Sequence, residues 1–231
     1  MHVIVFDTET TGLPLDRKTP PSCTEDWPSI VQISWIEYDT LLHKIIGMGD
    51  HLVRLRSGVT LSPASTAVHG ITRSLLSRKG VSPELAMEEF LAALGRSDRV
   101  IAHNLDFDQA VVQAECYRQG LQNPFGGGAR PYCTAKAGVP LVQAWCEKNG
   151  RRFLRFPKLW ELHKELFNHD VDNLHDSLAD VLVCLRCYLL MVHDSDLMNC
   201  TRARQLYALY RIGSTKRCKL TSARYEDGGQ P

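Results

Sequence analysis

The chain has 231 residues, of which 44% are hydrophobic and 23% are charged, and its formal net charge is +1. This length suits one domain with a short extension, and the hydrophobic content is enough to build a core. The near-neutral charge excludes a protein that coats nucleic acid non-specifically. It is compatible with an enzyme that acts on nucleic acid, because acidic catalytic groups offset a basic rim.

The first ten residues, MHVIVFDTET, contain neither the basic segment nor the cleavage site of a secretory signal. No run of 18 or more apolar residues predicts a membrane span. We therefore expect an intracellular protein of a reducing compartment, cytoplasm or nucleus, that is neither secreted nor membrane-bound. In such a compartment the eight cysteines are expected to be reduced thiols.

Short apolar or alternating runs predict three early strands, at residues 3–6, 31–38 and around 44–55. The segment between the first two is rich in Pro, Ser and charge, which is typical of a loop. A helix is expected from Ser82, a capping residue, to Gly95, because apolar side chains recur there on one helical face.

The second half of the chain is predicted to be mainly helical. A short buried strand over 99–103 precedes a helix that runs to about Arg118, and a short strand is expected near 132–134. Further helices are predicted over 137–149, over 157–168 and from near Asp176 onward. Strands and helices interleave, which indicates an α/β domain with a mixed sheet of about five strands flanked by helices.

Charge is unevenly distributed along the chain. From Thr201 to Pro231 there are seven Lys or Arg and two acidic residues, a surplus of five positive charges. A basic tail can contact phosphates electrostatically, or it can be a solvated segment without a role. We therefore divide the chain into a domain over 1–198 and a basic C-terminal extension over 199–231.

Two acidic residues, Asp7 and Glu9, follow the first predicted strand. Side chains at i and i+2 project from the same face of a strand, so the two carboxylates are expected to lie close together. Such a pair repels unless a cation neutralises it, and hard divalent ions such as Mg²⁺ and Mn²⁺ take oxygen ligands. Taken alone, the pair can also simply begin a polar turn.

Two further segments carry acidic residues, one just after the fourth predicted strand and the other at the start of the last predicted helix. Asp106 and Asp108 follow the fourth predicted strand and compete for the same role. In the other segment Asp176 is a candidate helix cap, and Asp180 lies one turn along that helix. His175 precedes the helix, and histidine is the side chain that exchanges protons near neutral pH.

Four segments, FDTETTGL, VHGIT, AHNLDFD and HDSLAD, occur in this order within residues 1–193. Together they resemble the motifs of the DEDDh family of 3′–5′ exonucleases, which belongs to the RNase H-like superfamily. The resemblance implies an RNase H-like α/β fold. One departure lies beside the last segment, where Ser177 stands in place of the Ala that is usual in the family.

The resemblance also implies roles for individual residues. Four positions match the carboxylates that hold two divalent cations, Mg²⁺ or Mn²⁺, in the catalytic centre: Asp7, Glu9, Asp108 and Asp180. Asp108 is the match rather than Asp106, because it directly follows Phe in the HNxxFD pattern. His175 matches the general base, which completes the catalytic set.

Four more residues are expected to contact the substrate: Thr10, Leu13, His69 and Phe107. Leu13 resembles the family residue that wedges between the last two bases, and Phe107 is placed to pack on the terminal nucleotide. Thr10 is expected to hold the 3′-hydroxyl, and His69 lies in the substrate-side VHGIT segment. Leu13 and Phe107 can alternatively be ordinary core residues, and His69 a hydrogen-bonded structural histidine.

The implied activity is metal-dependent hydrolysis of phosphodiester bonds from a free 3′ end, which releases nucleoside 5′-monophosphates. DNA is the favoured substrate, single-stranded or frayed, in proofreading or repair. RNA stays open as an alternative, as does a catalytically inactive nucleic-acid-binding module on the same fold. A polymerase or another replication or repair protein is a candidate partner, and a homodimer is a candidate assembly.

Overall fold

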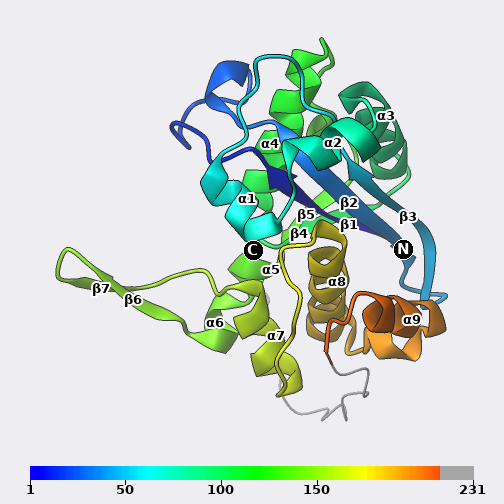
Figure 1. Ribbon diagram of the computed structural model, residues 1–231. Coiled ribbons are helices and arrows are strands. Elements are labelled where there is room, and N and C mark those ends of the chain that lie inside the picture. The colour runs from blue at the N-terminus through cyan, green and yellow to red at the C-terminus, as the bar shows by residue number, and fades with distance from the viewer. Residues whose placement is uncertain (214–231) are drawn as a thin grey trace.

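A five-stranded mixed sheet forms the centre of the computed structural model, which describes residues 1–213 (Figure 1). The strands are β1 (His2–Thr10), β2 (Ile30–Asp39), β3 (Lys44–Leu52), β4 (Arg99–Ala102) and β5 (Arg130–Cys133), in the spatial order β3-β2-β1-β4-β5. β2 pairs antiparallel with β1 and β3, whereas β4 runs parallel to both β1 and β5. The carboxyl ends of β1, β4 and β5 therefore meet at one edge of the sheet.

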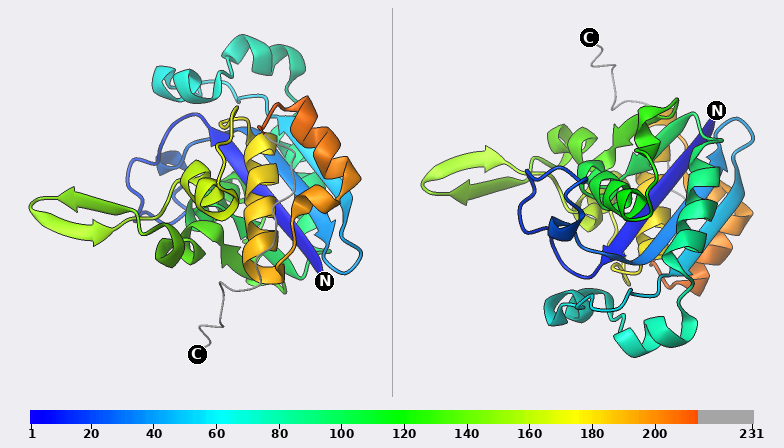
Figure 2. Two further views of the ribbon diagram at one scale, coloured as in Figure 1. Left: turned by 90° about the horizontal axis from the view of Figure 1, so that it is seen from below. Right: turned by 90° about the horizontal axis from the view of Figure 1, so that it is seen from above.

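Helices cover both faces of this sheet (Figures 1 and 2). Those of the described residues are α1 (Pro63–His69), α2 (Arg73–Lys79), α3 (Pro83–Leu94), α4 (Leu105–Arg118), α5 (Thr134–Ala137), α6 (Val139–Val142), α7 (Leu159–Phe167), α8 (Ser177–His193) and α9 (Thr201–Leu209). One hydrophobic core joins the sheet to α7, α8 and α9, and a second joins its other face to α3 and α4. None of these helices is long and apolar enough to cross a bilayer.

The alternation of side chains along β1 explains why its sequence is apolar at every early position. Val3 and Val5 lie in the core with α8, whereas Ile4 and Phe6 lie in the core with α3 and α4. A strand covered on both faces needs apolar residues on both, so residues 3–6 form an uninterrupted apolar run. The predicted α/β architecture with about five strands is confirmed.

The helix predicted over 137–149 is wrong beyond Val142. After the short helices α5 and α6, the chain forms a hairpin of β6 (Trp145–Lys148) and β7 (Arg151–Leu154). The two-residue turn is Asn149–Gly150, with φ of 53° and 71°. Positive φ at both positions defines a type I′ turn, which Asn-Gly favours, so this dipeptide sets the hairpin.

Helices α1, α2 and α9 were not predicted from the sequence. The seven-residue helices α1 and α2 begin at side-chain caps, where Ser62 accepts from the Ala64 N–H and Thr72 accepts from the Leu75 N–H. Helix α9 packs on α8 and buries Ala203 and Tyr207. The predicted basic extension therefore begins with a packed helix, and its residues 214–231 lie outside the described part of the chain.

The core around α8 encloses a fully buried guanidinium. Arg186 donates to both carboxylate oxygens of Asp196, with Nε–Oδ1 at 2.9 Å and Nη2–Oδ2 at 3.0 Å, and its guanidinium lies 4.1 Å from the Phe167 ring centroid. This ion pair joins α8 to the segment before α9. A buried charge that loses its partner is strongly destabilising.

Asp196→Ala should therefore lower the free energy of unfolding by about 3–5 kcal/mol, measured by chemical denaturation. The matched control is Asp106→Ala, which removes the exposed Lys136–Asp106 pair and should cost less than about 1 kcal/mol. Equal effects of the two substitutions would show that the buried pair does not hold α8 and α9 together.

Candidate active site

Strand β1 delivers two carboxylates to the carboxyl edge of the sheet. Asp7 and Glu9 continue the odd-numbered positions Val3 and Val5, so they project toward α8, and both are partly buried. The Ser177 hydroxyl at the start of α8 donates to the Asp7 main-chain oxygen at 2.8 Å. This bond ties the end of β1 to the first turn of α8.

The intervening residue, Thr8, points to the opposite side and holds Asp108. Its N–H and its hydroxyl donate to the same oxygen, Asp108 Oδ1, at 3.1 and 2.8 Å. Asp108 lies in the first turn of α4 and is almost fully buried. Thr8 was not singled out from the sequence, although its position between Asp7 and Glu9 was the available signal.

Helix α8 supplies the fourth carboxylate. Asp176 caps this helix by accepting from the Leu178 and Ala179 N–H groups, as predicted, which places Asp180 one turn further along. Asp180 Oδ2 accepts from the His175 N–H at 3.2 Å. Its other oxygen, Oδ1, is buried and has no hydrogen-bond partner among the described residues.

His175 lies directly beside the acids. Its ring nitrogen and carboxylate oxygens of Glu9 and Asp180 lie within 4.8 Å of one another. The residue has φ of 76°, a left-handed conformation that is uncommon for a side chain other than glycine. The side chain is exposed, so it is accessible to a water molecule at the edge of the acidic cluster.

The carboxylates strongly perturb one another. Burial raises the pKa of Asp7 to about 7, and the charge of Asp176 adds to this effect. Burial followed by the charges of Asp7 and Asp180 raises the pKa of Glu9 to about 9. Burial and the charge of Asp7 also raise the pKa values of Asp108 and Asp180 well above their usual range.

These residues fit a site for hard divalent cations. The cluster offers several carboxylates, which are the ligands that Mg²⁺ and Mn²⁺ prefer. The buried Asp180 Oδ1 lacks a donor among the described residues, and burial followed by neighbouring carboxylate charge raises the pKa values of Glu9 and Asp180, which disfavours their ionised forms. A cation would satisfy both.

The structure separates the two candidate acids of the AHNLDFD segment. Asp108 joins the buried cluster, whereas Asp106 is exposed and forms an ion pair with Lys136 at 2.7 Å. The acids of β1, α4 and α8 lie near one another, because the charges of Asp7, Asp108 and Asp180 all act on Glu9. Glu9 and Asp180 also lie within 4.8 Å of the ring of His175, which is in the loop before α8.

Thr10 and His69 are joined by a hydrogen bond. The Ile71 N–H donates to His69 Nδ1 at 3.0 Å, so the ring proton is on Nε2, which donates to the Thr10 carbonyl at 3.3 Å. The Thr10 hydroxyl donates to the Gly12 carbonyl at 2.7 Å. His69 thus has the structural hydrogen bonds that were the alternative to a substrate contact, and it also lines the cavity described next.

The other two predicted substrate contacts differ in exposure. Leu13 is 71% exposed, so it is not a core residue in this structure. Phe107 is partly buried and packs against the core formed with α3 and α4. Of these two, Leu13 therefore has the accessible side chain that a wedge between bases requires.

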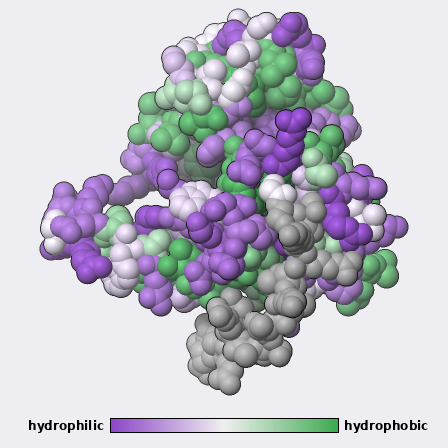
Figure 3. Space-filling model, turned by 60° about the horizontal axis from the view of Figure 1, so that its bottom comes forward, coloured by the Kyte–Doolittle hydropathy of each residue, from purple (hydrophilic) through white to green (hydrophobic). Residues whose placement is uncertain are grey.

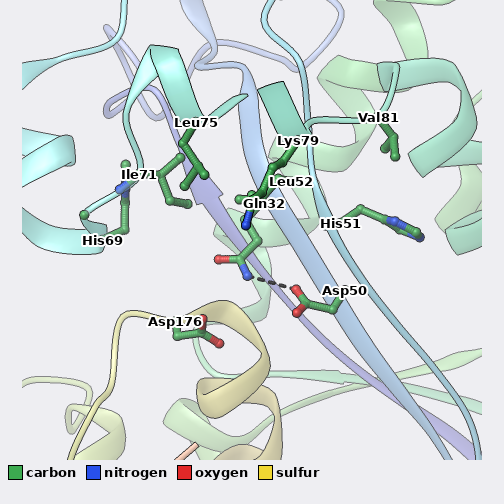
Figure 4. A pocket seen from close by; sticks show the side chains of 11 residues that line it. Gln32, Asp50, His51, Leu52, His69, Ile71, Leu75, Lys79, Val81 and Asp176 are labelled. Carbon is green, nitrogen blue, oxygen red and sulfur yellow. Dashed lines mark hydrogen bonds between the residues drawn. The ribbon is translucent and has the colours of Figure 1, made fainter. Parts of the chain in front are cut away.

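A cavity of about 510 Å³ opens beside the cluster (Figure 4). Figure 4 shows Gln32 and Asp50 on the sheet facing Asp176 on α8, with His69 and Lys79 on the opposite wall, and Gln32 donates to Asp50 at 2.9 Å. Sequence reasoning missed this cavity, because its lining residues come from six separate segments of the chain.

Residues 4–188 match the exonuclease family model RNase T. The chain belongs to this exonuclease family. The matched region runs from β1 into α8, so it includes all four clustered acids and His175. The family resemblance predicted from the four sequence segments is confirmed.

Solved structures of E. coli exonuclease I have the same fold. The complex with a dT13 oligonucleotide has 17% sequence identity and a TM-score of 0.62, covering 90% of this chain and 43% of that one. The zinc-bound complex with single-stranded DNA has 18% identity and a TM-score of 0.62, covering 84% and 41%. The chain thus spans less than half the length of these structures, and their likeness shows an exonuclease I-like, RNase H-like fold. Comparison with curated proteins gave no match.

The raised carboxyl pKa values predict a pH-dependent stability. Asp7 and Glu9 bind protons more tightly in the folded chain than in the unfolded one, because their pKa values are raised. The free energy of unfolding should therefore fall as pH rises from 3.8 to about 7 through Asp7 and from 4.5 to about 9 through Glu9. Added Mn²⁺ should raise the melting temperature more at pH 8 than at pH 5.5, because protons then compete less.

The variant Glu9→Gln isolates this effect, since it removes the carboxyl whose pKa is raised to about 9. Thermal unfolding in EDTA should show a smaller loss of stability between pH 7 and 9 for this variant than for the wild type. Parallel pH profiles for the two proteins would rule out a raised Glu9 pKa.

Proposed function

We propose that this exonuclease family member hydrolyses phosphodiester bonds one nucleotide at a time from the free 3′ end of a strand. The observation that carries the proposal is that Asp7, Asp108 and Asp180 lie near enough to Glu9 for their charges to act on it. His175 lies within 4.8 Å of Glu9 and Asp180. The expected products are nucleoside 5′-monophosphates. Four acids of distant sequence origin gain nothing by folding together unless they bind cations.

The four carboxylates would hold two divalent cations, Mg²⁺ or Mn²⁺. Such ions supply a lowered pKa for bound water and neutralise charge on the phosphate. Other residues of the chain orient these carboxylates. Thr8 holds Asp108, and Ser177 holds the end of β1. The Asp176 cap sets the start of α8 and hence the position of Asp180.

His175 is the proposed general base. Its ring lies beside Glu9 and Asp180, is exposed, and is carried by a backbone conformation that the Asp180 carboxylate stabilises through the His175 N–H. In this position it accepts a proton from the attacking water. Leu13 and Phe107 are proposed to contact the terminal bases, and Thr10 and His69 to line the pocket for the terminal nucleotide.

DNA is the proposed substrate, in single-stranded or frayed form. The E. coli exonuclease I structures of the same fold hold single-stranded DNA oligonucleotides, which supports testing this substrate first. RNA is the alternative, because the acidic cluster makes no distinction between sugars. A role in proofreading or repair, beside a polymerase or a similar partner, is proposed from the resemblance of the four sequence segments to the DEDDh family. A reducing intracellular compartment is proposed from the unpaired cysteines of the described residues.

The direct test is digestion of 5′-labelled oligonucleotides with Mg²⁺ or Mn²⁺. Wild-type protein should give a ladder shortened from the 3′ end, and chromatography should detect nucleoside 5′-monophosphates. Asp180→Ala should abolish shortening, whereas Asp106→Ala should retain it.

Parallel digestions of DNA and RNA substrates, both single- and double-stranded, decide the substrate class. A wild-type protein that shifts the labelled band without shortening it would be a binding module instead.

The proposed base predicts a distinct pattern. His175→Ala should lower turnover by about 10²–10⁴-fold, because proton transfer is lost, while Mn²⁺ binding measured by calorimetry stays near the wild-type level. Asp7→Ala should abolish both. The control is His193→Ala at the other end of α8, roughly 24 Å from Ser177 along the helix axis. Similar, mild losses for His175→Ala and His193→Ala would contradict the assignment.

A further inference from the structure

The hairpin of β6 and β7 is an arm that extends away from the body of the protein (Figures 1 and 2). All four residues of β7 are exposed, including Phe153, and Trp145 of β6 is 53% exposed. In Figure 3 the arm is the projection on the left, with a largely hydrophilic surface. A lone two-stranded hairpin has little stability of its own in water, and these exposed aromatic side chains are not part of the protein core. Stability of the fold therefore does not explain why they are there.

The root of the arm is fixed to the edge of the sheet that carries the acids. His103 directly follows β4, and its Nε2 donates to the buried Pro157 carbonyl at 2.9 Å, while Nδ1 accepts from the Thr134 hydroxyl at 3.0 Å. Burial lowers the pKa of His103 to about 4, so the ring stays neutral and keeps this pattern. Asp108 follows in the next helix, α4, so the arm leaves the body at the active-site edge.

A second set of contacts sets the direction of the arm. Arg155 forms a bidentate pair with Glu161 of α7, with nitrogen–oxygen distances of 2.6 and 2.7 Å. The main-chain N–H of Arg155 also donates to the Ala144 carbonyl at 2.9 Å, and this bond closes the base of the hairpin. The arm is therefore held by side-chain bonds at its root, and Arg155 already has its acidic partner.

The two faces of the arm differ in charge. Directly opposite residues of an antiparallel pair share a face, so Lys148 and Arg151 project together, as do Cys146 and Phe153. Neighbouring pairs separated by two positions lie on one face, so these four residues form a basic face that carries two cations and one aromatic ring but no acid.

On the opposite face of the arm, called the neutral face below, one acidic and one basic residue balance each other in charge. This face consists of the pairs Trp145–Leu154 and Glu147–Arg152. Glu147 faces Arg152 across the strands, and the Arg152 guanidinium lies 5.2 Å from the centroid of the Trp145 ring. The cation and the aromatic ring of this face therefore already interact with each other.

We propose that the basic face of the arm binds the single-stranded part of the nucleic acid upstream of the 3′ end. Lys148 and Arg151 pair with phosphates, and a base stacks on Phe153. The inference rests on the proposed function. Residues 1–200 contain 20 Lys or Arg and 24 Asp or Glu, so a polyanion needs local cations to approach this body. Phosphate contacts and stacking are also independent of base sequence, as an exonuclease requires.

The test measures binding and turnover separately. Fluorescence anisotropy with a 5′-fluorescein-labelled 30-nucleotide single strand, in EDTA and over a salt series, reports affinity without hydrolysis. The double variant Lys148→Ala/Arg151→Ala should reduce the slope of log K against log salt by about 1.4, which corresponds to two lost phosphate contacts. Phe153→Ala should weaken binding by about fivefold or more. Turnover on a tetranucleotide should change less than about twofold in all of these variants.

The neutral face supplies matched controls. Arg152→Ala removes the same side chain as Arg151→Ala from the adjacent position, and Trp145→Ala removes an aromatic ring as Phe153→Ala does. Both controls should leave binding of the 30-mer near the wild-type level. Equal losses from Arg151→Ala and Arg152→Ala, or an unchanged salt slope in the double variant, would overturn the proposal and favour a protein partner for the arm. If the wild type shortens no oligonucleotide, the proposed function fails, yet the anisotropy series still decides whether the arm binds nucleic acid.

Discussion

The burial of four neighbouring carboxylates is the constraint on which the site depends. Asp7, Glu9, Asp108 and Asp180 are brought together at one edge of the sheet, where burial and mutual charge raise their pKa values. This arrangement costs folding free energy at neutral pH, because the acids must either keep protons or remain charged in a poorly solvated place. The hydrophobic cores on both faces of the sheet have to offset that cost.

The scaffold controls which way each acid points. Alternation along β1 sends Asp7 and Glu9 toward α8 and sends Thr8 toward α4, where it holds Asp108 with two hydrogen bonds. On the other side, the Ser177 bond and the Asp176 cap set the start of α8. A single strand thus organises acids from two helices, and it does so because it is buried on both faces. The same edge also holds the root of the β6–β7 arm through His103, which links the site to the surface that we propose binds nucleic acid.

Much of this could be predicted from the sequence. The apolar run before Asp7 predicted a buried strand, and the spacing of Asp7 and Glu9 predicted a shared face, because both depend only on the two-residue period of a strand. The choice of Asp108 over Asp106 came from a motif, and the structure places Asp106 on the surface with Lys136.

Other features depend on contacts between distant segments, which no local pattern contains. The cavity beside Asp176 and the Arg186–Asp196 pair are of this kind. The hairpin is a different case, since Asn149–Gly150 is a local signal of a turn at the end of the segment that was predicted to be helical. The helices α1 and α2 have only seven residues each, which is too short to show a clear helical periodicity in the sequence. Their N-termini are instead set by the caps at Ser62 and Thr72.

The measurement that tests the central claim most directly is anomalous diffraction from crystals grown with Mn²⁺. The account predicts manganese peaks in contact with carboxylate oxygens of Asp7, Glu9, Asp108 and Asp180, and their loss in crystals of Asp180→Asn. Manganese that is absent from this cluster, or that binds only elsewhere on the protein, would contradict it.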